Sequence, residues 1–217
     1  MSRIIVLIDN GHGIDSAGKH SPDYSLMEWE YTREIAAYVI AELRDLGIDA
    51  HYLVQETWDV ALSERARRVN MMCDKYGDDN VLLVSIHVDA AGGDGKWHEA
   101  GGWSCFTTKG KTKSDQVAEL FYDSAEVHLA EYKEYFAELK RKGVYGVKQR
   151  PIRTDTSDGD RDREENFTIL YKTKCPAVLT ENLFQDNKAD VAYLLSDKGK
   201  KSIIDLHVAA IRRYLNV

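Results

Sequence analysis

The chain has 217 residues, of which 43% are hydrophobic and 30% charged, the balance of an ordinary soluble protein with one sizeable core. Its formal net charge of −7 argues against a general nucleic-acid-binding protein, because such proteins need an excess of lysine and arginine to neutralise phosphates. The 3 cysteines are scattered and form no Cys-x-x-Cys pair, which excludes a disulfide framework and favours buried, reduced thiols.

The amino-terminal apolar run is short. Asp9 interrupts it after residues 4–8, so it can form neither a membrane span nor the apolar region of a signal peptide. No internal repeat or low-complexity segment divides the chain. We therefore expect a single domain over residues 1–217 without a membrane span.

The first half of the chain predicts alternating strands and helices. The apolar run at residues 4–8 predicts a strand, and the glycine-, serine- and aspartate-rich residues 13–26 predict a loop. Apolar side chains at helical spacing predict a helix over residues 28–46. A strand over residues 48–54 and a second helix over residues 59–76 follow, each ended by a glycine or a turn.

The second half continues the pattern, beginning with a nearly continuous apolar run that is typical of a strand covered on both faces. The predicted elements are a strand at 81–88, a strand at 101–107, a long amphipathic helix at 114–142 with at most one break, a charged surface loop at 148–165, a strand at 176–181 and a helix at 198–215. This order predicts an α/β fold with a mainly parallel sheet of about six strands and helices on both faces.

Three of the predicted strands end near residues that can bind metal or move protons. His12 lies in a glycine-flanked turn after the first strand, His87 ends the strand at 81–88, and Glu181 ends the strand at 176–181. Because the carboxyl ends of parallel strands meet at one edge of a sheet, we expect these side chains to converge.

His12, Glu28 and His87 form a candidate metal site. Two imidazoles and one carboxylate are the ligand set that leaves a zinc ion one open position for water, which can ionise near neutral pH. A single histidine at the end of a buried strand is more often structural, but several such groups together would be costly to bury unpaired. Glu30 is the competing carboxylate, and we favour Glu28 because it lies in the first helical turn, facing the loop.

Glu181 and Asp9 complete the predicted site. An unligated Glu181 could take a proton from the water and pass it to a leaving amine. Asp9 could accept a hydrogen bond from the ring of His12 and so orient this ligand.

Four ordered motifs resemble the amidase type 3 family of zinc-dependent N-acetylmuramoyl-L-alanine amidases. Residues 9–13, DNGHG, resemble its opening Asp-x-Gly-His-Gly motif, and Glu28 matches its second metal ligand. Residues 85–90, SIHVDA, are similar to its Ser-Ile-His-x-Asn-Ala segment, with Asp89 in place of the frequent asparagine. Residues 176–184 resemble the late motif that carries the catalytic glutamate.

The resemblance implies one catalytic α/β domain with a zinc ion on His12, Glu28 and His87 and with Glu181 as the catalytic residue. It also implies hydrolysis of the amide between the lactyl group of N-acetylmuramic acid and L-alanine in peptidoglycan, and hence action at the bacterial cell wall. We expect an elaborated helical and loop segment over about residues 110–165 and no separate wall-binding domain. The absence of a visible signal peptide fits phage-type release from the cytoplasm, but it also fits a wall-remodelling enzyme that is exported by another route.

Two other functions fit the same residues. The chain could be a non-catalytic domain of the same fold that binds or regulates at peptidoglycan. It could also be a zinc carboxypeptidase or deacetylase with the same ligand set. The products released from purified peptidoglycan distinguish these functions from that of an amidase.

Overall fold

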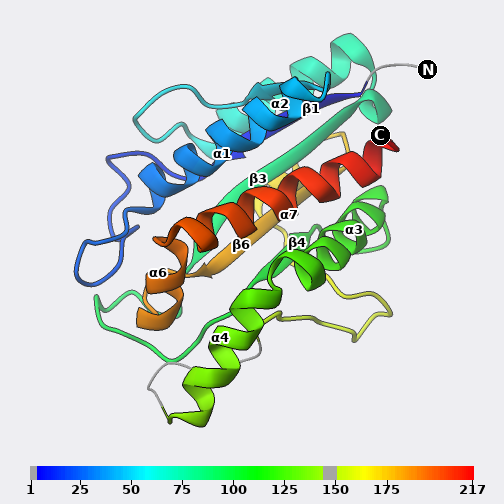
Figure 1. Ribbon diagram of the computed structural model, residues 1–217. Coiled ribbons are helices and arrows are strands. Elements are labelled where there is room, and N and C mark those ends of the chain that lie inside the picture. Colours follow the sequence, from blue (N-terminus) through cyan, green and yellow to red (C-terminus); the bar gives the residue numbers. More distant parts are fainter. Residues whose placement is uncertain (1–3, 144–150) are drawn as a thin grey trace.

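The computed structural model describes residues 4–143 and 151–217. Within these residues a six-stranded sheet has the order β2-β1-β3-β6-β4-β5 (Figure 1). Its strands are β1 (Ile5–Asn10), β2 (Asp49–Tyr52), β3 (Val81–Asp89), β4 (Ser104–Thr107), β5 (Arg163–Glu164) and β6 (Ala177–Phe184). The predicted α/β fold with about six strands is confirmed.

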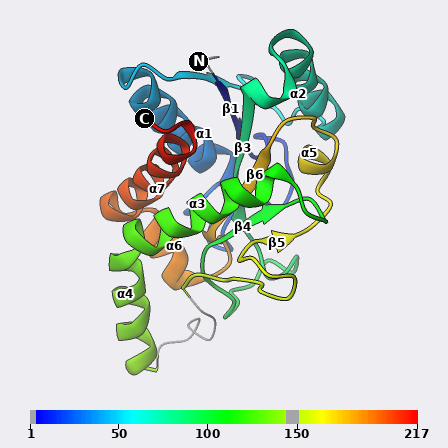
Figure 2. The same cartoon turned by 90° about the vertical axis from the view of Figure 1, so that its right-hand side faces the viewer.

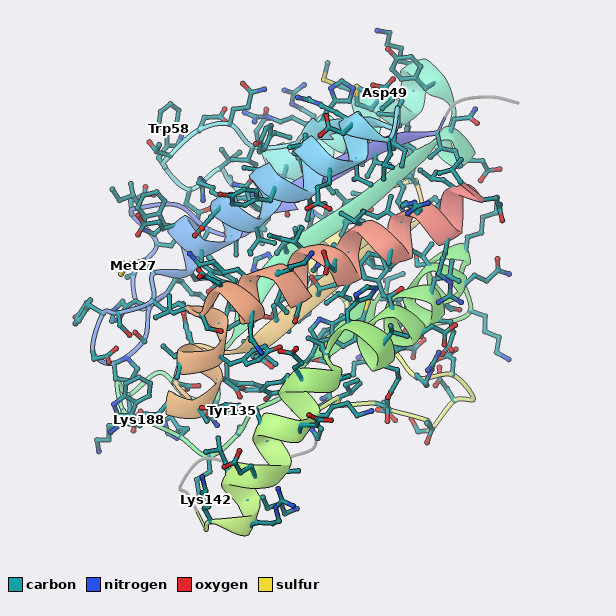
Figure 3. All side chains as sticks on the ribbon, viewed as in Figure 1. Met27, Asp49, Trp58, Tyr135, Lys142 and Lys188 are labelled. Atoms are coloured by element: carbon teal, nitrogen blue, oxygen red, sulfur yellow. The ribbon has the colours of Figure 1, made fainter. Side chains whose placement is uncertain are left out.

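The central strands β2, β1, β3 and β6 are parallel, so their carboxyl ends lie at one edge of the sheet. β4 runs antiparallel to β6, and β5 is parallel to β4. Figure 3 shows Met27 and Trp58 at the end of the molecule toward which the central strands point, whereas Asp49, the first residue of β2, lies at the other end. The loops before α1 and α2 therefore cover the edge where the predicted site lies.

Helices cover both faces of the sheet (Figure 2). One face carries α1 (Glu28–Asp45), α3 (Lys113–His128) and α7 (Asp197–Leu215), and the other carries α2 (Leu62–Tyr76) and α5 (Thr168–Tyr171). The remaining helices are α4 (Ala130–Arg141), α6 (Lys188–Leu194) and the short 3-10 helix η1 (Asp78–Asn80). Figure 1 shows that α4 extends from the end of α3 away from the sheet.

Each face of the sheet has its own apolar core because successive side chains of a strand point to opposite faces. In β1, Val6 and Ile8 belong to the core beneath α1, α3 and α7, whereas Ile5 and Leu7 belong to the core beneath α2. This division explains why the run at residues 4–8 is apolar at every position. Burial on both faces fixes the direction of β1 and therefore the position of the turn that follows it.

Several element boundaries differ from those predicted. The second helix begins at Leu62 instead of residue 59, and the long predicted helix is divided at Leu129 into α3 and α4. β6 continues to Phe184, beyond the predicted end at residue 181. Residues 148–150 of the predicted surface loop lie outside the described residues, and the described part contains β5.

All three cysteines, Cys73, Cys105 and Cys175, are buried and unbridged, as predicted. Among the described residues, the longest helices remain too polar to cross a membrane.

Candidate active site

The three candidate metal ligands lie together at the carboxyl edge of the sheet. His12 follows β1, His87 lies near the end of β3, and Glu28 is the first residue of α1. One potential ligand atom from each lies within 4.8 Å of the others. Glu30 is exposed and does not belong to this group.

The spacing of the ligand atoms fits a divalent ion. Glu28 Oε1 lies 3.2 Å from His87 Nδ1 and 3.5 Å from His12 Nε2. Neighbouring ligands in a tetrahedral zinc site with bonds of about 2.0–2.1 Å are about 3.3 Å apart. Glu28 Oε2 is buried without a hydrogen-bond partner among the described residues, which is costly unless another group satisfies it. The donor set and its spacing therefore fit zinc.

The pKa values of His12 and Glu28 are both lowered, which favours the forms of these side chains that bind a cation. Burial lowers the pKa of His12 to about 4, so that at neutral pH its ring is uncharged and offers a lone pair. Burial opposes the ionised form of Glu28, but hydrogen bonding to His87 and the charges of both histidines lower its pKa below the usual value. The two rings meet edge to face, with centroids 5.1 Å apart.

The glycine before His12 is required by close packing. A Cβ atom on Gly11 would lie 2.5 Å from His87 Nδ1, well inside contact distance. His12 itself has a φ of 59°, in the left-handed region that a non-glycine residue adopts only when its surroundings hold it there. The turn after β1 therefore places the two histidine rings against one another.

Glu181 lies directly opposite His87 in the parallel pairing of β6 with β3. It occupies the middle of β6, which corrects the prediction that it ends its strand. Its Oε2 is buried without a hydrogen-bond partner among the described residues. Burial, followed by the negative charges of Asp89 and Glu28, raises the pKa of Glu181 well above its usual value. Its surroundings therefore favour the protonated form of this carboxyl group over the ionised form.

His12, Glu28, His87 and Glu181 line one cavity of about 470 Å³. Part of its wall is apolar and is formed by Leu62, Phe167, Ile169 and Leu179. A larger groove of about 760 Å³ lies between α4 and the segment from α6 to the start of α7, but none of the predicted site residues lines it. The smaller cavity is the candidate active site because it alone of these two combines candidate metal ligands with an acid.

Asp9 does not have the predicted role of orienting His12. Its Oδ1 accepts a hydrogen bond from Arg65 Nη1 at 2.7 Å, and its Oδ2 accepts one from Ser85 Oγ at 2.6 Å. Arg65 is buried and also donates to the carbonyl oxygens of Asn10 at 2.7 Å and His12 at 3.3 Å. The ion pair of Asp9 and Arg65 thus supports the backbone of the turn and not the imidazole ring.

Three further contacts beside the site, made by Arg153 and Asn182, escaped the sequence analysis. Asp89 accepts a hydrogen bond from Arg153 Nη1 at 3.0 Å, and Arg153 also lies over the ring of Phe184 at 4.8 Å. Asn182 donates from Nδ2 to the carbonyl oxygen of His87 at 2.9 Å. Asn182 lies within a motif that the resemblance singled out, whereas no local pattern marks Arg153, whose partner is 64 residues away.

The family model described as N-acetylmuramoyl-L-alanine amidase, amidase type 3, matches residues 6–213. The chain belongs to this family. It is 27% identical over 215 residues to the endolysin of Bacillus phage SPP1 and 26% identical over 214 residues to the N-acetylmuramoyl-L-alanine amidase CwlM of Bacillus licheniformis. These matches cover 98% of this chain but only 66% and 69% of the two relatives, so the chain spans about two thirds of their length.

Solved amidases share the fold of this family member. The N-acetylmuramoyl-L-alanine amidase of Clostridium difficile 630 matches with a TM-score of 0.70 and 22% identity, covering 100% of this chain and 98% of the other. The catalytic domain of CwlV from Bacillus (Paenibacillus) polymyxa var. colistinus matches with a TM-score of 0.69 and 20% identity, covering 99% of both chains. The α/β architecture described above is thus that of amidase catalytic domains.

Proposed function

We propose that this chain hydrolyses the amide between the lactyl group of N-acetylmuramic acid and L-alanine in peptidoglycan, with a zinc ion held by His12, Glu28 and His87. The observation that carries the proposal is the meeting of these three groups with Glu181 in one cavity. Membership of the amidase family supplies the substrate class. Action at the cell wall follows from the location of this substrate.

A zinc ion bound to the three ligands would supply a Lewis acid for the amide carbonyl and activate water as the nucleophile. Glu181 has the position and environment of the group that moves protons. In its carboxylate form, which a neighbouring dication favours, it accepts a proton from water. In its acid form, which burial favours, it donates a proton to the departing alanine nitrogen.

The rest of the site holds these groups in place. Arg65 fixes the backbone on both sides of Gly11, and Asn182 fixes the carbonyl of His87. The apolar wall formed by Leu62, Phe167, Ile169 and Leu179 limits water around the amide. Such support matters because small displacements of reacting groups reduce rates strongly.

The products of purified peptidoglycan test the proposal. We expect new alanine amino termini without new sugar reducing ends, and we expect a chelator to abolish the release and added zinc to restore it. Release of free D-alanine from the carboxyl terminus of the peptide would instead identify a carboxypeptidase, and release of acetate would identify a deacetylase. Binding to the wall material without any released group would identify a non-catalytic domain.

A further inference from the structure

Lys19 is the only lysine or arginine among the described residues that line the candidate active site. Its ammonium has no hydrogen bond or ion pair with any described residue. By contrast, Arg153 beside the same site is paired with Asp89. A positive charge at the wall of a cavity and without a protein partner is available to an anionic group of the substrate.

The backbone of Lys19 is fixed, although its ammonium has no partner within residues 4–143 and 151–217. Its carbonyl oxygen accepts a hydrogen bond from the backbone N–H of Glu28 at 3.0 Å. The carbonyl oxygen of Gly18 accepts a hydrogen bond from Gln185 Nε2 at 3.3 Å. The loop that carries Lys19 is therefore attached both to the candidate ligand Glu28 and to the chain just beyond β6.

Lys19 also lies close to the reacting groups, because it lines the same cavity of about 470 Å³ as His12, Glu28 and Glu181. A substrate group bound by Lys19 must therefore be near the bond that is cleaved.

We propose that Lys19 binds a carboxylate of the substrate, that of the acidic residue next to alanine in the peptide. This inference rests on the proposed function. On the sugar side of the scissile amide, the nearby groups are neutral hydroxyl and acetamido groups, whereas the peptide side carries free carboxylates. A lysine ammonium pairs with a carboxylate through a charge-assisted hydrogen bond, so Lys19 would select the anionic form of the peptide.

The test compares two synthetic substrates that differ at one group. Both are N-acetylmuramoyl-L-alanyl peptides, one with a free α-carboxylate on the second residue and the other with the corresponding amide. For Lys19→Met we expect KM for the carboxylate substrate to rise by about tenfold to a hundredfold, because a hydrogen bond to a charged group is lost. We expect KM for the amide substrate to change little.

The controls separate substrate binding from other roles. Lys19→Arg keeps a positive charge and should preserve the preference for the carboxylate. Lys111→Met removes an exposed lysine two residues before Lys113. Lys113 pairs with Asp79, which precedes β3 and therefore lies at the opposite edge of the sheet from the site. This variant should leave both KM values unchanged. Zinc content should stay the same in all three variants.

Binding of the same two compounds, measured by calorimetry, provides a readout that needs no turnover. The unaltered protein should bind the carboxylate compound more tightly, and Lys19→Met should remove the difference. Equal losses with both compounds would overturn the proposal and place Lys19 at the reaction centre, and no loss with either would show that it does not contact this group. If the protein binds with the expected preference but releases no alanine terminus, the proposed function fails and the assignment of Lys19 stands.

Discussion

Glu181 and His87 face one another on neighbouring parallel strands, in register in the pairing of β6 with β3. The pairing sets the separation of the Glu181 carboxyl group and a candidate metal ligand by backbone hydrogen bonds instead of by flexible loops. A site built on strands is held more precisely than one built on loops.

Replacing Glu181 should separate metal binding from turnover. We expect Glu181→Gln to retain zinc, because the ligand group does not include Glu181, and to lose about 10²–10⁴-fold in turnover, because proton transfer is lost. Metal analysis beside a peptidoglycan assay measures both properties. Glu165→Gln, at an exposed position, is the matched control, and normal turnover in the Glu181 variant would remove this residue from the mechanism.

Replacing either candidate histidine ligand should abolish both zinc binding and turnover. His12→Ala and His87→Ala each leave at most two of the three ligand atoms, so we expect zinc to be lost together with activity. His98→Ala is the control, since His98 is paired with Asp94 and lies outside the ligand group. Full zinc content in either ligand variant would contradict the assignment.

Gly11→Ala tests the contact between the turn and His87. The added Cβ would lie 2.5 Å from His87 Nδ1, so the ring must move out of the ligand geometry. We expect about a 10–100-fold loss of zinc affinity, the size of effect seen when the orientation of a ligand is disturbed. Competition with a zinc chelator measures the affinity. Gly93→Ala, where an added Cβ meets no atom within 4 Å, should change nothing, and equal affinities for the two variants would rule out a steric role of this contact.

The buried ion pair of Arg65 and Asp9 should contribute strongly to folding stability. Arg65→Met leaves the buried carboxylate of Asp9 without its cation, and we expect the free energy of unfolding to fall by about 3–5 kcal/mol. Removing the charge as well, in Arg65→Met with Asp9→Asn, should recover part of the loss. Arg67→Met breaks an exposed pair with Glu64 and should change the free energy of unfolding, measured by denaturant titration, far less. Equal effects of the two single variants would contradict the role of the buried pair.

Asp162 should make the protein less stable as pH rises from mildly acidic to neutral. Burial raises its pKa from 3.8 to about 7, opposed by a hydrogen bond from Thr107 and reinforced by the neighbouring Asp160. Because the folded state then holds the proton more tightly than the unfolded state, this contribution is complete below about pH 4 and is lost as pH rises through about 7.

Asp162→Asn removes this titration, so the free energy of unfolding of the variant should fall less than that of the unaltered protein between pH 4.5 and pH 7.5, a window that spans most of the interval between the two pKa values. Denaturant titrations at several pH values measure the difference. Identical pH profiles for the two proteins would show that the folded state does not retain this proton.

The sequence predicted the parts of the fold that depend on local pattern. Apolar periodicity located the central strands and the main helices, and the first turn of α1 placed Glu28 correctly toward His12. Very short elements such as β5 and α5 were not predicted, because two or four residues carry no measurable period. The break at Leu129 lies inside a continuous helical pattern and depends on packing.

The parts of the site that depend on distant partners could not be predicted. Asp9 was assigned to the nearby His12, but its partners Arg65 and Ser85 are 56 and 76 residues away along the chain. Lys19 lay in a loop expected to carry function, yet nothing in its local sequence distinguishes a free cation from a paired one. Charge pairing between separate elements becomes visible only in the folded chain.

The order of the strands divides the site between the two ends of the chain. All three candidate ligands lie between His12 and His87, in the turn after β1, at the start of α1 and on β3, whereas Glu181 comes with β6 on the far side of β3. A ribosome that has released only the first half of the polypeptide has thus supplied all three candidate ligands but not Glu181. Under the proposed function, hydrolytic competence is withheld until the last strand docks.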